Sequence, residues 1–297
     1  MSIGMRQQFV KTMTDLAHQN ENVVVLLNDI GVWAFRHLKA EYPNRVHNLG
    51  IMEQASIGIA AGLSMTGYIP FFHTIAPFIA ERGYEQLKDD FGYQNINGNF
   101  VSVGASFDYS KMGMTHNCPA EVGALMQIPN MQIVLPGTAL EEDTLIKSAY
   151  DNGSPTYFRL AEKSNSAEHE VLFGKATVIR KGSLATVIAV GNMLDGVLQA
   201  AQDKDVTILY YTTLRPFDAE TLRNNAPNEK ILLCEPYYSG ALLYDILQTF
   251  PGKPLQIELV GMAHEIVHTY GTYEENLRYF QMTTEATAEK LNRLIGE

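Results

Sequence analysis

Glu53 is the residue best placed to do chemistry, because it stands where a predicted strand meets a predicted helix that is nearly free of charge. The surrounding segment 49–54 reads Leu-Gly-Ile-Met-Glu-Gln, and the run 60–63, Ala-Ala-Gly-Leu, follows it. A carboxylate that is buried on folding is either neutralised or kept there because it has a function. A Glu at a helix start more often complements the helix dipole, so this segment alone leaves both interpretations open.

Three other side chains could act beside such a carboxylate. Phe78 lies in the segment 73–78, His-Thr-Ile-Ala-Pro-Phe, and could be a core aromatic or a stacking surface for a flat heterocycle. His116 follows a Thr and could be structural, or could exchange protons near neutral pH. Asp29 ends a short apolar run, so it either caps a turn or lies at the strand edge where α/β proteins place their sites.

Two arginines could hold an anion. Arg6 begins the first predicted helix, and Arg159 lies in the segment 157–160, Tyr-Phe-Arg-Leu. A single Arg is more often an ordinary surface cation. The planar fork of a guanidinium nevertheless suits a tetrahedral anion, which it can meet with two hydrogen bonds.

The order and spacing of these motifs resemble thiamine-diphosphate enzymes of the transketolase type along essentially the whole chain. The resemblance implies that Glu53 protonates the aminopyrimidine ring of thiamine diphosphate and that Phe78 stacks on that ring. Ile75 occupies a position where the family often has a second aromatic, so one wall of the pocket is expected to be aliphatic. Asp29 is expected near the thiazolium ring.

The same resemblance implies a transferase that moves a two-carbon ketol unit from a ketose to an aldose. His116 would reach the carbonyl and hydroxyl of the sugar, while Arg6 and Arg159 would hold the distal phosphate. Glu53 and His116 are therefore the expected catalytic residues, and the substrate is expected to be a small anionic sugar.

Three departures from the family pattern concern the sugar. Trp33 stands in a segment without the usual Ser, the segment 103–106 reads Val-Gly-Ala-Ser without the usual His, and Met112 replaces an Asp. We therefore expect a substrate other than the standard pentose phosphate, such as a branched, deoxy or sulfonated sugar.

A partner subunit is expected because the chain has no Gly-Asp-Gly segment, the family signature for binding Mg²⁺ and the cofactor's diphosphate. Such a site needs oxygen ligands and oriented backbone donors. The chain thus resembles the C-terminal half of a split transketolase. We predict a separate N-terminal subunit that holds Mg²⁺ and the diphosphate, in an α2β2 assembly.

Other functions remain open from the sequence. Within the same superfamily, the chain could serve a deoxyxylulose-phosphate synthase-like enzyme or act as the β subunit of a 2-oxoacid dehydrogenase. From another class, it could be a non-catalytic paralogue that scaffolds an active partner. The choice of donor, and cofactor-dependent turnover with the partner, separate these possibilities.

The pattern of apolar runs predicts an α/β protein with two doubly wound domains and mostly parallel sheets. We assign 1–165 to a pyrimidine-binding domain and 171–297 to a transketolase C-terminal domain, with the boundary in the polar, aperiodic stretch 162–170. The predicted strands are 23–27, 100–103, 131–135, 184–190, 206–210 and 230–234. The predicted helices are 5–18, 55–65, 141–150, 195–202, 218–224 and 239–247.

Composition narrows the class of protein. The 297 residues are 46% hydrophobic and 19% charged, as in a folded soluble protein. The formal charge of −11 argues against a general nucleic-acid surface. The two cysteines, Cys118 and Cys234, form no metal motif, and the start of the chain does not resemble a signal peptide, so we expect a cytoplasmic protein. No apolar run is long enough to span a membrane.

Overall fold

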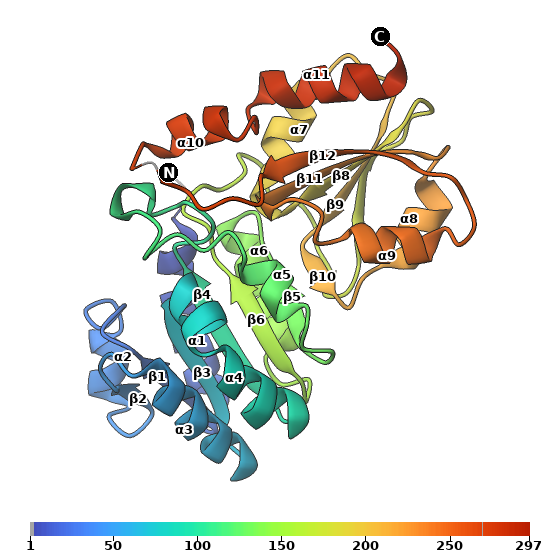
Figure 1. The fold of residues 1–297 in the computed structure, drawn as a ribbon. Helices are drawn as coiled ribbons and strands as arrows, with labels where there is room; N and C mark the ends of the chain where they lie inside the picture. Colours follow the sequence, from blue (N-terminus) through green and yellow to red (C-terminus); the bar gives the residue numbers. More distant parts are fainter. Residues whose placement is uncertain (1–2, 269) are drawn as a thin grey trace.

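Two β-sheets organise the chain, one in each of two lobes, in a computed structural model that describes residues 3–268 and 270–297 (Figure 1). The strands are β1 (Val23–Leu27), β2 (Val46–Asn48), β3 (Ile69–Ile75), β4 (Gly98–Val103), β5 (Gln132–Val134), β6 (Pro155–Arg159), β7 (Thr177–Arg180), β8 (Thr186–Val190), β9 (Thr207–Tyr211), β10 (Thr213–Arg215), β11 (Lys230–Tyr238) and β12 (Gln256–Met262). The first sheet has the order β10-β5-β6-β4-β3-β1-β2, and the second has the order β12-β11-β8-β9-β7.

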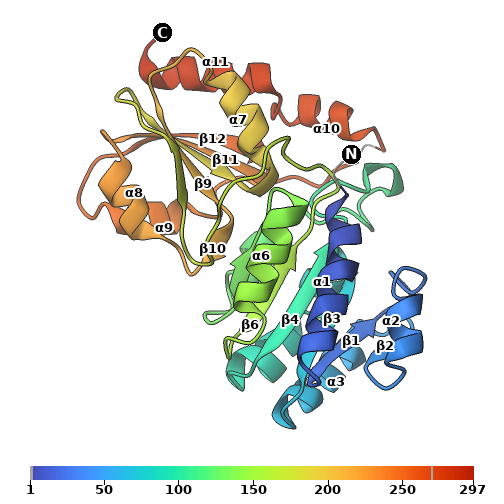
Figure 2. The same ribbon diagram turned by 180° about the vertical axis from the view of Figure 1, so that it is seen from behind.

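Helices cover both faces of each sheet. They are α1 (Met5–Gln19), α2 (Arg36–Glu41), α3 (Glu53–Met65), α4 (Tyr84–Gln86), α5 (Glu121–Leu125), α6 (Ala139–Ala149), α7 (Leu194–Ala200), α8 (Ala219–Asn225), α9 (Leu243–Thr249), α10 (Tyr273–Tyr279) and α11 (Thr284–Ile295). In the first lobe, α1 and α6 pack together on one face, and α3, α4 and α5 lie on the other (Figures 1 and 2). In the second lobe, α7 and α11 lie opposite α8 and α9.

Burial on both faces explains why the strands are uniformly apolar. In β1, Val23, Val25 and Leu27 pack into the core that includes α1, whereas Val24 and Leu26 pack into the core that includes α3. All five side chains are buried. Strands of this kind belong to parallel sheets covered by helices on both sides. In the two sheets, only the edge strands β10 and β7 pair antiparallel to their neighbours. The predicted α/β class with mostly parallel sheets is confirmed.

The predicted elements match the observed ones closely except at one helix and one strand, since the strand expected over 230–234 continues to Tyr238 in β11. The strand at 23–27 coincides with β1, and the helix at 5–18 ends one residue before α1 does. The helix expected over 239–247 begins only at Leu243, as α9. Gly240 has a φ of +95°, and the buried Glu235 carboxylate accepts hydrogen bonds from the backbone N–H groups of Gly240 and Leu242. This capped turn occupies the residues where the periodicity alone favoured helix.

One strand links the two lobes. The strands before residue 160 lie in the first sheet and those after residue 171 lie in the second, except that β10 leaves the second lobe to pair with β5. The backbone N–H of Leu135 also donates to the carbonyl of Thr212. The segment 171–297 therefore contributes an edge strand to the sheet that positions the candidate site.

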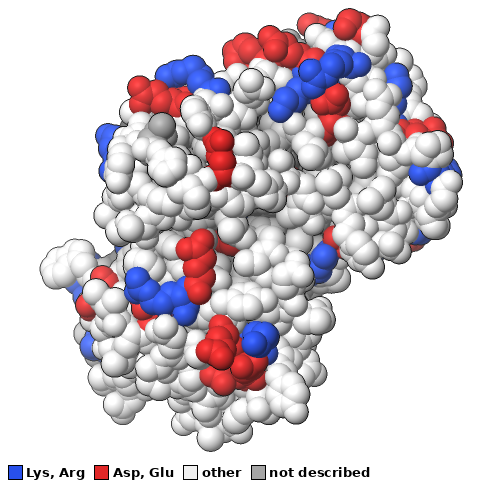
Figure 3. All heavy atoms as spheres, viewed as in Figure 1, with Lys and Arg blue, Asp and Glu red and all other residues white. Residues whose placement is uncertain are grey.

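The surface in Figure 3 carries Lys and Arg interspersed with Asp and Glu, in small groups separated by uncharged surface. Among the residues that the structure describes, no helix is long and apolar enough to cross a membrane.

Candidate active site

Most of the predicted site residues meet at the carboxyl edge of the first sheet. The segments after β1, β3 and β4 leave this edge together because the three strands are parallel neighbours. They enclose a cavity of about 310 Å³, a size within the usual range for small-molecule sites. Its lining residues are Asn28, Asp29, Ile30, Ile51, Glu53, Thr74, Ile75, Phe78, Tyr109, Met112 and His116. Five of the seven site residues expected from the sequence thus line one cavity.

Glu53 is the first residue of α3 and is only 1% exposed. Its Oε2 accepts a hydrogen bond of 2.8 Å from Nη1 of Arg82. Its Oε1 is buried and has no hydrogen-bond partner in the described chain. Because a buried carboxylate oxygen without a partner is costly, this oxygen is suited to meet a donor on a bound molecule.

Phe78 forms an aromatic surface beside Glu53. The guanidinium of Arg82 lies 3.9 Å from the centre of the Phe78 ring, and the His116 ring packs against it edge-on at 5.9 Å. Phe78 and Arg82 begin and end a π-helical segment, η1 (Phe78–Arg82). Such segments are rare and often occur at functional sites. Arg82 is thus shared between the aromatic ring and the Glu53 carboxylate.

Asp29 is held by a reciprocal pair of hydrogen bonds with Asn48, the last residue of β2. The Asp29 backbone N–H donates to Oδ1 of Asn48 at 2.9 Å, and Nδ2 of Asn48 donates to Oδ1 of Asp29 at 2.7 Å. Asp29 has a φ of +52°, an uncommon value for a residue with a side chain. The pair fixes the Asp29 carboxylate at the mouth of the cavity.

His116 and Met112 form the side of the cavity contributed by the segment after β4. Nδ1 of His116 lies 2.9 Å from the hydroxyl of Thr115. This contact fixes the ring and leaves Nε2 as the nitrogen that can meet a bound molecule. Met112, where the family has an Asp, is 53% exposed, so this side of the cavity has a thioether in place of a carboxylate.

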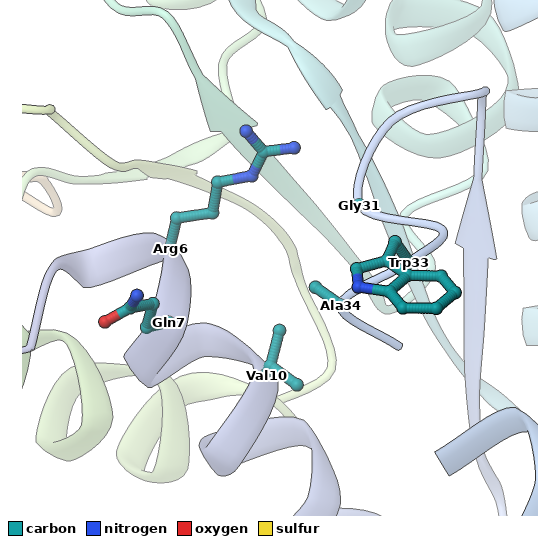
Figure 4. A pocket seen from close by; sticks show the side chains of 6 residues that line it. All are labelled: Arg6, Gln7, Val10, Gly31, Trp33 and Ala34. Carbon is teal, nitrogen blue, oxygen red and sulfur yellow. The ribbon is translucent and has the colours of Figure 1, made fainter. Parts of the chain in front are cut away.

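Arg6 borders the neighbouring cavities. It projects from the first turn of α1 toward the space that Trp33 borders from the loop after β1 (Figure 4). A second cavity of about 370 Å³ also has Arg6 in its lining and shares Tyr109 with the Glu53 cavity. Arg6 makes no hydrogen bond or ion pair with any described residue. Its guanidinium is therefore free to bind an anion.

Arg159 does not lie with the other predicted residues. It is 2% exposed, and its Nε donates to Oε1 of Glu121 at 2.6 Å. Its Nη2 donates to the hydroxyl of Ser106 and to the carbonyl of Pro236 in the second lobe. The guanidinium thus joins the two lobes in a buried network, and an anion would have to compete with a carboxylate already in place.

Three residues that shape this site were not predicted from the sequence. Arg82 and Asn48 orient Glu53 and Asp29, and Asn28 lines the cavity directly. The four-residue spacing of Arg82 from Phe78 was a signal that could have been used, because such residues lie on one side of a helical turn. The other two contacts depend on the pairing of β1 with β2 and on the cavity, which no local pattern indicates.

No group of three or more His, Cys, Asp or Glu side chains in the described part of the chain could hold a metal ion.

Comparisons with known proteins give a family match and several relatives. Residues 1–166 match the family model of the transketolase pyrimidine-binding domain. The chain is 34% identical to an uncharacterised 33.6 kDa protein of the fasciation locus of Rhodococcoides fascians, covering 97% of this chain and 94% of that protein. It is 27% identical to one of the subunits of the apulose-4-phosphate transketolase of Phocaeicola vulgatus, covering 93% of this chain and 95% of that subunit.

A solved structure described as a split-gene transketolase, in an inactive β4 tetramer, has the same fold. Its TM-score is 0.88 with 99% of both chains covered, at 23% identity.

Proposed function

The chain belongs to the transketolase pyrimidine-binding domain family, and we propose that it is the C-terminal, catalytic subunit of a two-subunit transketolase that uses thiamine diphosphate. The observation that carries the proposal is that Glu53, whose Oε1 is buried without a partner, lines a cavity together with Phe78. The resemblance seen in the motifs is confirmed by the relatives and by the family match.

The side chains around the cavity fit an aminopyrimidine ring. Glu53 supplies an acceptor for a ring nitrogen that carries or shares a proton, and Phe78 supplies an apolar face for the ring. Ile75 is buried and lines the cavity beside them, as expected for an aliphatic wall. These three residues and Asp29 would hold the pyrimidine half of the cofactor.

When bound, thiamine diphosphate supplies the electron sink that lets the bond between C2 and C3 of a ketose break. Glu53 would hold a proton between its carboxylate and a nitrogen of the ring. Arg82 fixes the carboxylate in position for this role. Burial around Glu53 excludes water, which strengthens its hydrogen bond to a bound group. His116, which lines the same cavity, would move a proton at the sugar hydroxyl.

The substrate that fits best is an anionic ketose of unusual shape. We propose Arg6 as the residue that holds the anionic end, because its guanidinium has no other partner in the described chain. Arg159, expected beside it from the sequence, is instead bound to Glu121, and we leave it out of the substrate site. Met112 and Trp33 border the cavities where the family has polar groups, which favours a branched, deoxy or sulfonated sugar. The relative from P. vulgatus is named for a sugar phosphate, which supports this class.

A separate N-terminal subunit would complete the enzyme by holding Mg²⁺ and the diphosphate, in an α2β2 assembly. Two findings support this part of the proposal. The relative from P. vulgatus, matched over almost its full length, is named as one subunit of a transketolase. The split-gene structure with the same fold is described as an inactive assembly of β chains.

The test is the variant Glu53→Gln in the complex with the N-terminal subunit. Gln keeps the shape of Glu but cannot exchange a proton, so we expect a loss of about 10²–10⁴-fold in turnover, the usual range for a general acid or base. The far-ultraviolet circular dichroism spectrum should match that of the wild type. Turnover that survives the substitution would overturn the assignment of Glu53.

The choice of donor tests the reaction itself. The wild-type complex should use ketoses and not pyruvate or other 2-oxoacids. Use of a 2-oxoacid would instead place the chain with deoxyxylulose-phosphate synthases or 2-oxoacid dehydrogenases, and a lack of any cofactor-dependent turnover would indicate a scaffolding role.

A further inference from the structure

Asn28 is a polar side chain buried without a partner. It follows β1 directly and is 4% exposed. Both Oδ1 and Nδ2 are buried, and neither has a hydrogen-bond partner among the described residues. Nearly all buried amides in folded proteins are paired, since leaving the donor and acceptor unpaired is costly. An amide in this state is suited to bind a group that is not part of the folded chain.

The position of Asn28 indicates where that partner binds. Along β1 successive side chains alternate between faces, and Leu26 packs into the same core as Ile57 of α3. Asn28 comes two residues after Leu26 and so extends from the α3 side of the sheet. The first residue of α3 is Glu53, and both residues line the 310 Å³ cavity.

Two residues with buried, unpaired polar atoms, Glu53 and Asn28, therefore line one cavity that has an aromatic wall. Glu53 contributes an acceptor through Oε1, while Asn28 contributes an acceptor through Oδ1 and a donor through Nδ2. Phe78 contributes the apolar face. An aminopyrimidine is flat, carries N–H donors on its amino group and has ring-nitrogen acceptors, so it complements this set. A sugar hydroxyl lacks the flat face that Phe78 would cover.

We propose that Asn28 is a ligand of the aminopyrimidine ring. Asn28 binds the ring through its side-chain amide, and Glu53 binds it through its carboxylate. This inference rests on the proposed function, because it names a further residue that holds the same cofactor. It assigns Asn28 to cofactor binding and not to recognition of the sugar.

The first test uses the chain alone, without cofactor or partner. Asn28→Leu keeps nearly the same shape and removes the unpaired amide, so the variant should be more stable than the wild type. We expect the melting temperature to rise by about 2–4 °C. A fall in the melting temperature would mean that the amide is already paired in the folded chain, directly or through an ordered water, and would overturn the proposal.

Asn117 provides a matched control. It is fully buried, and both of its amide atoms also lack partners in the described chain, but it does not line this cavity. Asn117→Leu tests what the loss of a buried amide does by itself. Its binding of thiamine diphosphate in the complex should equal that of the wild type.

The second test uses equilibrium dialysis with Mg²⁺ to measure how tightly thiamine diphosphate binds to the complex with the N-terminal subunit. Asn28→Leu should weaken binding about tenfold, as expected for the loss of roughly one hydrogen bond. Binding equal to that of the wild type would overturn the proposal, as would a raised KM for the sugar with unchanged cofactor affinity.

The two hypotheses fail in different ways. Lack of ketol transfer by the wild-type complex would refute the proposed function but would leave the binding result for Asn28 interpretable. Unchanged cofactor binding by Asn28→Leu in an active complex would refute only the role of Asn28.

Discussion

Replacing Arg82 by Met removes the one cation that contacts both Glu53 and Phe78 among the described residues. The ion pair has an N–O distance of 2.8 Å, with the Glu53 side chain 2% exposed and the Arg82 side chain 39% exposed. Breaking a fully buried pair typically costs about 3–5 kcal/mol, whereas a fully exposed pair contributes about 0–1 kcal/mol. Because water screens the Arg82 side, we expect an intermediate cost of about 1–2 kcal/mol.

The contact of Arg82 with the Phe78 ring adds to this loss. A partly exposed guanidinium over an aromatic face contributes about 0.5–1 kcal/mol. Together the two contacts, about 1.5–3 kcal/mol, correspond to a fall in melting temperature of about 3–12 °C, taking about 2–4 °C per kcal/mol for a chain somewhat smaller than this one. Arg82→Lys keeps the positive charge and should recover part of the loss.

The effect of Arg82→Met on exchange of the cofactor C2 proton distinguishes a positioning role for Arg82 from a merely structural one. Exchange of the cofactor C2 proton for deuterium, measured in the complex without sugar, should slow in Arg82→Met because Glu53 loses its orientation. Arg82→Lys should restore part of the rate, and the KM for the sugar should change little in either variant.

Arg36 supplies the matched control for Arg82. Its guanidinium lies 4.3 Å from the Trp33 ring, so it makes a similar aromatic contact without contacting Glu53. Arg36→Met should leave C2 exchange unchanged. If Arg82→Met keeps both the stability and the exchange rate of the wild type, the reasoning about the Glu53 pair is refuted.

Three more substitutions test the rest of the site and the second lobe. His116→Ala should lower sugar turnover while C2 exchange in the absence of sugar persists, and a severe loss of exchange would contradict its assignment to the sugar. Arg6→Met should raise the KM for an anionic ketose more than tenfold, which corresponds to a loss of more than about 1.4 kcal/mol of binding free energy. The affinity for the cofactor should not change. Equal KM values for the variant and the wild type would contradict an anion site at Arg6. Burial raises the pKa of Glu235 from its ordinary value of 4.5 to about 7, so its contribution to stability is complete below about pH 4.5 and is lost as the pH rises to about 7. Melting temperatures measured across this range should fall less steeply for Glu235→Gln, and equal slopes would refute the link.

Local patterns in the sequence were sufficient for the fold class and for the core of the site. The uninterrupted apolar run of β1 is what a strand buried on both faces requires, and it was predicted to the residue. The segment around Glu53 indicated a helix start in an uncharged setting, where the carboxylate is now seen to be buried. These features could be predicted because periodicity and helix starts depend on residues that are close in the chain.

Contacts between distant segments were not predictable in this way. The Arg159 motif indicated an anion site, but the side chain binds Glu121, which lies 38 residues away, and the carbonyl of Pro236 in the other lobe. Likewise, no local pattern indicated that β10, from the second lobe, would pair with β5 in the first sheet. The partner of a charged group depends on which strands become neighbours, and that order is fixed by packing over the whole chain.

The sequence by itself determined an α/β chain of the transketolase type with a cofactor-activating carboxylate expected at Glu53. Only the tertiary structure decided how that carboxylate is held. It placed Arg82 on one oxygen, left the other oxygen unpaired in a residue that lines a cavity together with Asn28, and kept Arg6 free while Arg159 was bound elsewhere. The physical reason is that residue type and spacing specify which groups are available, whereas burial and neighbours in space decide which of them remain without a partner.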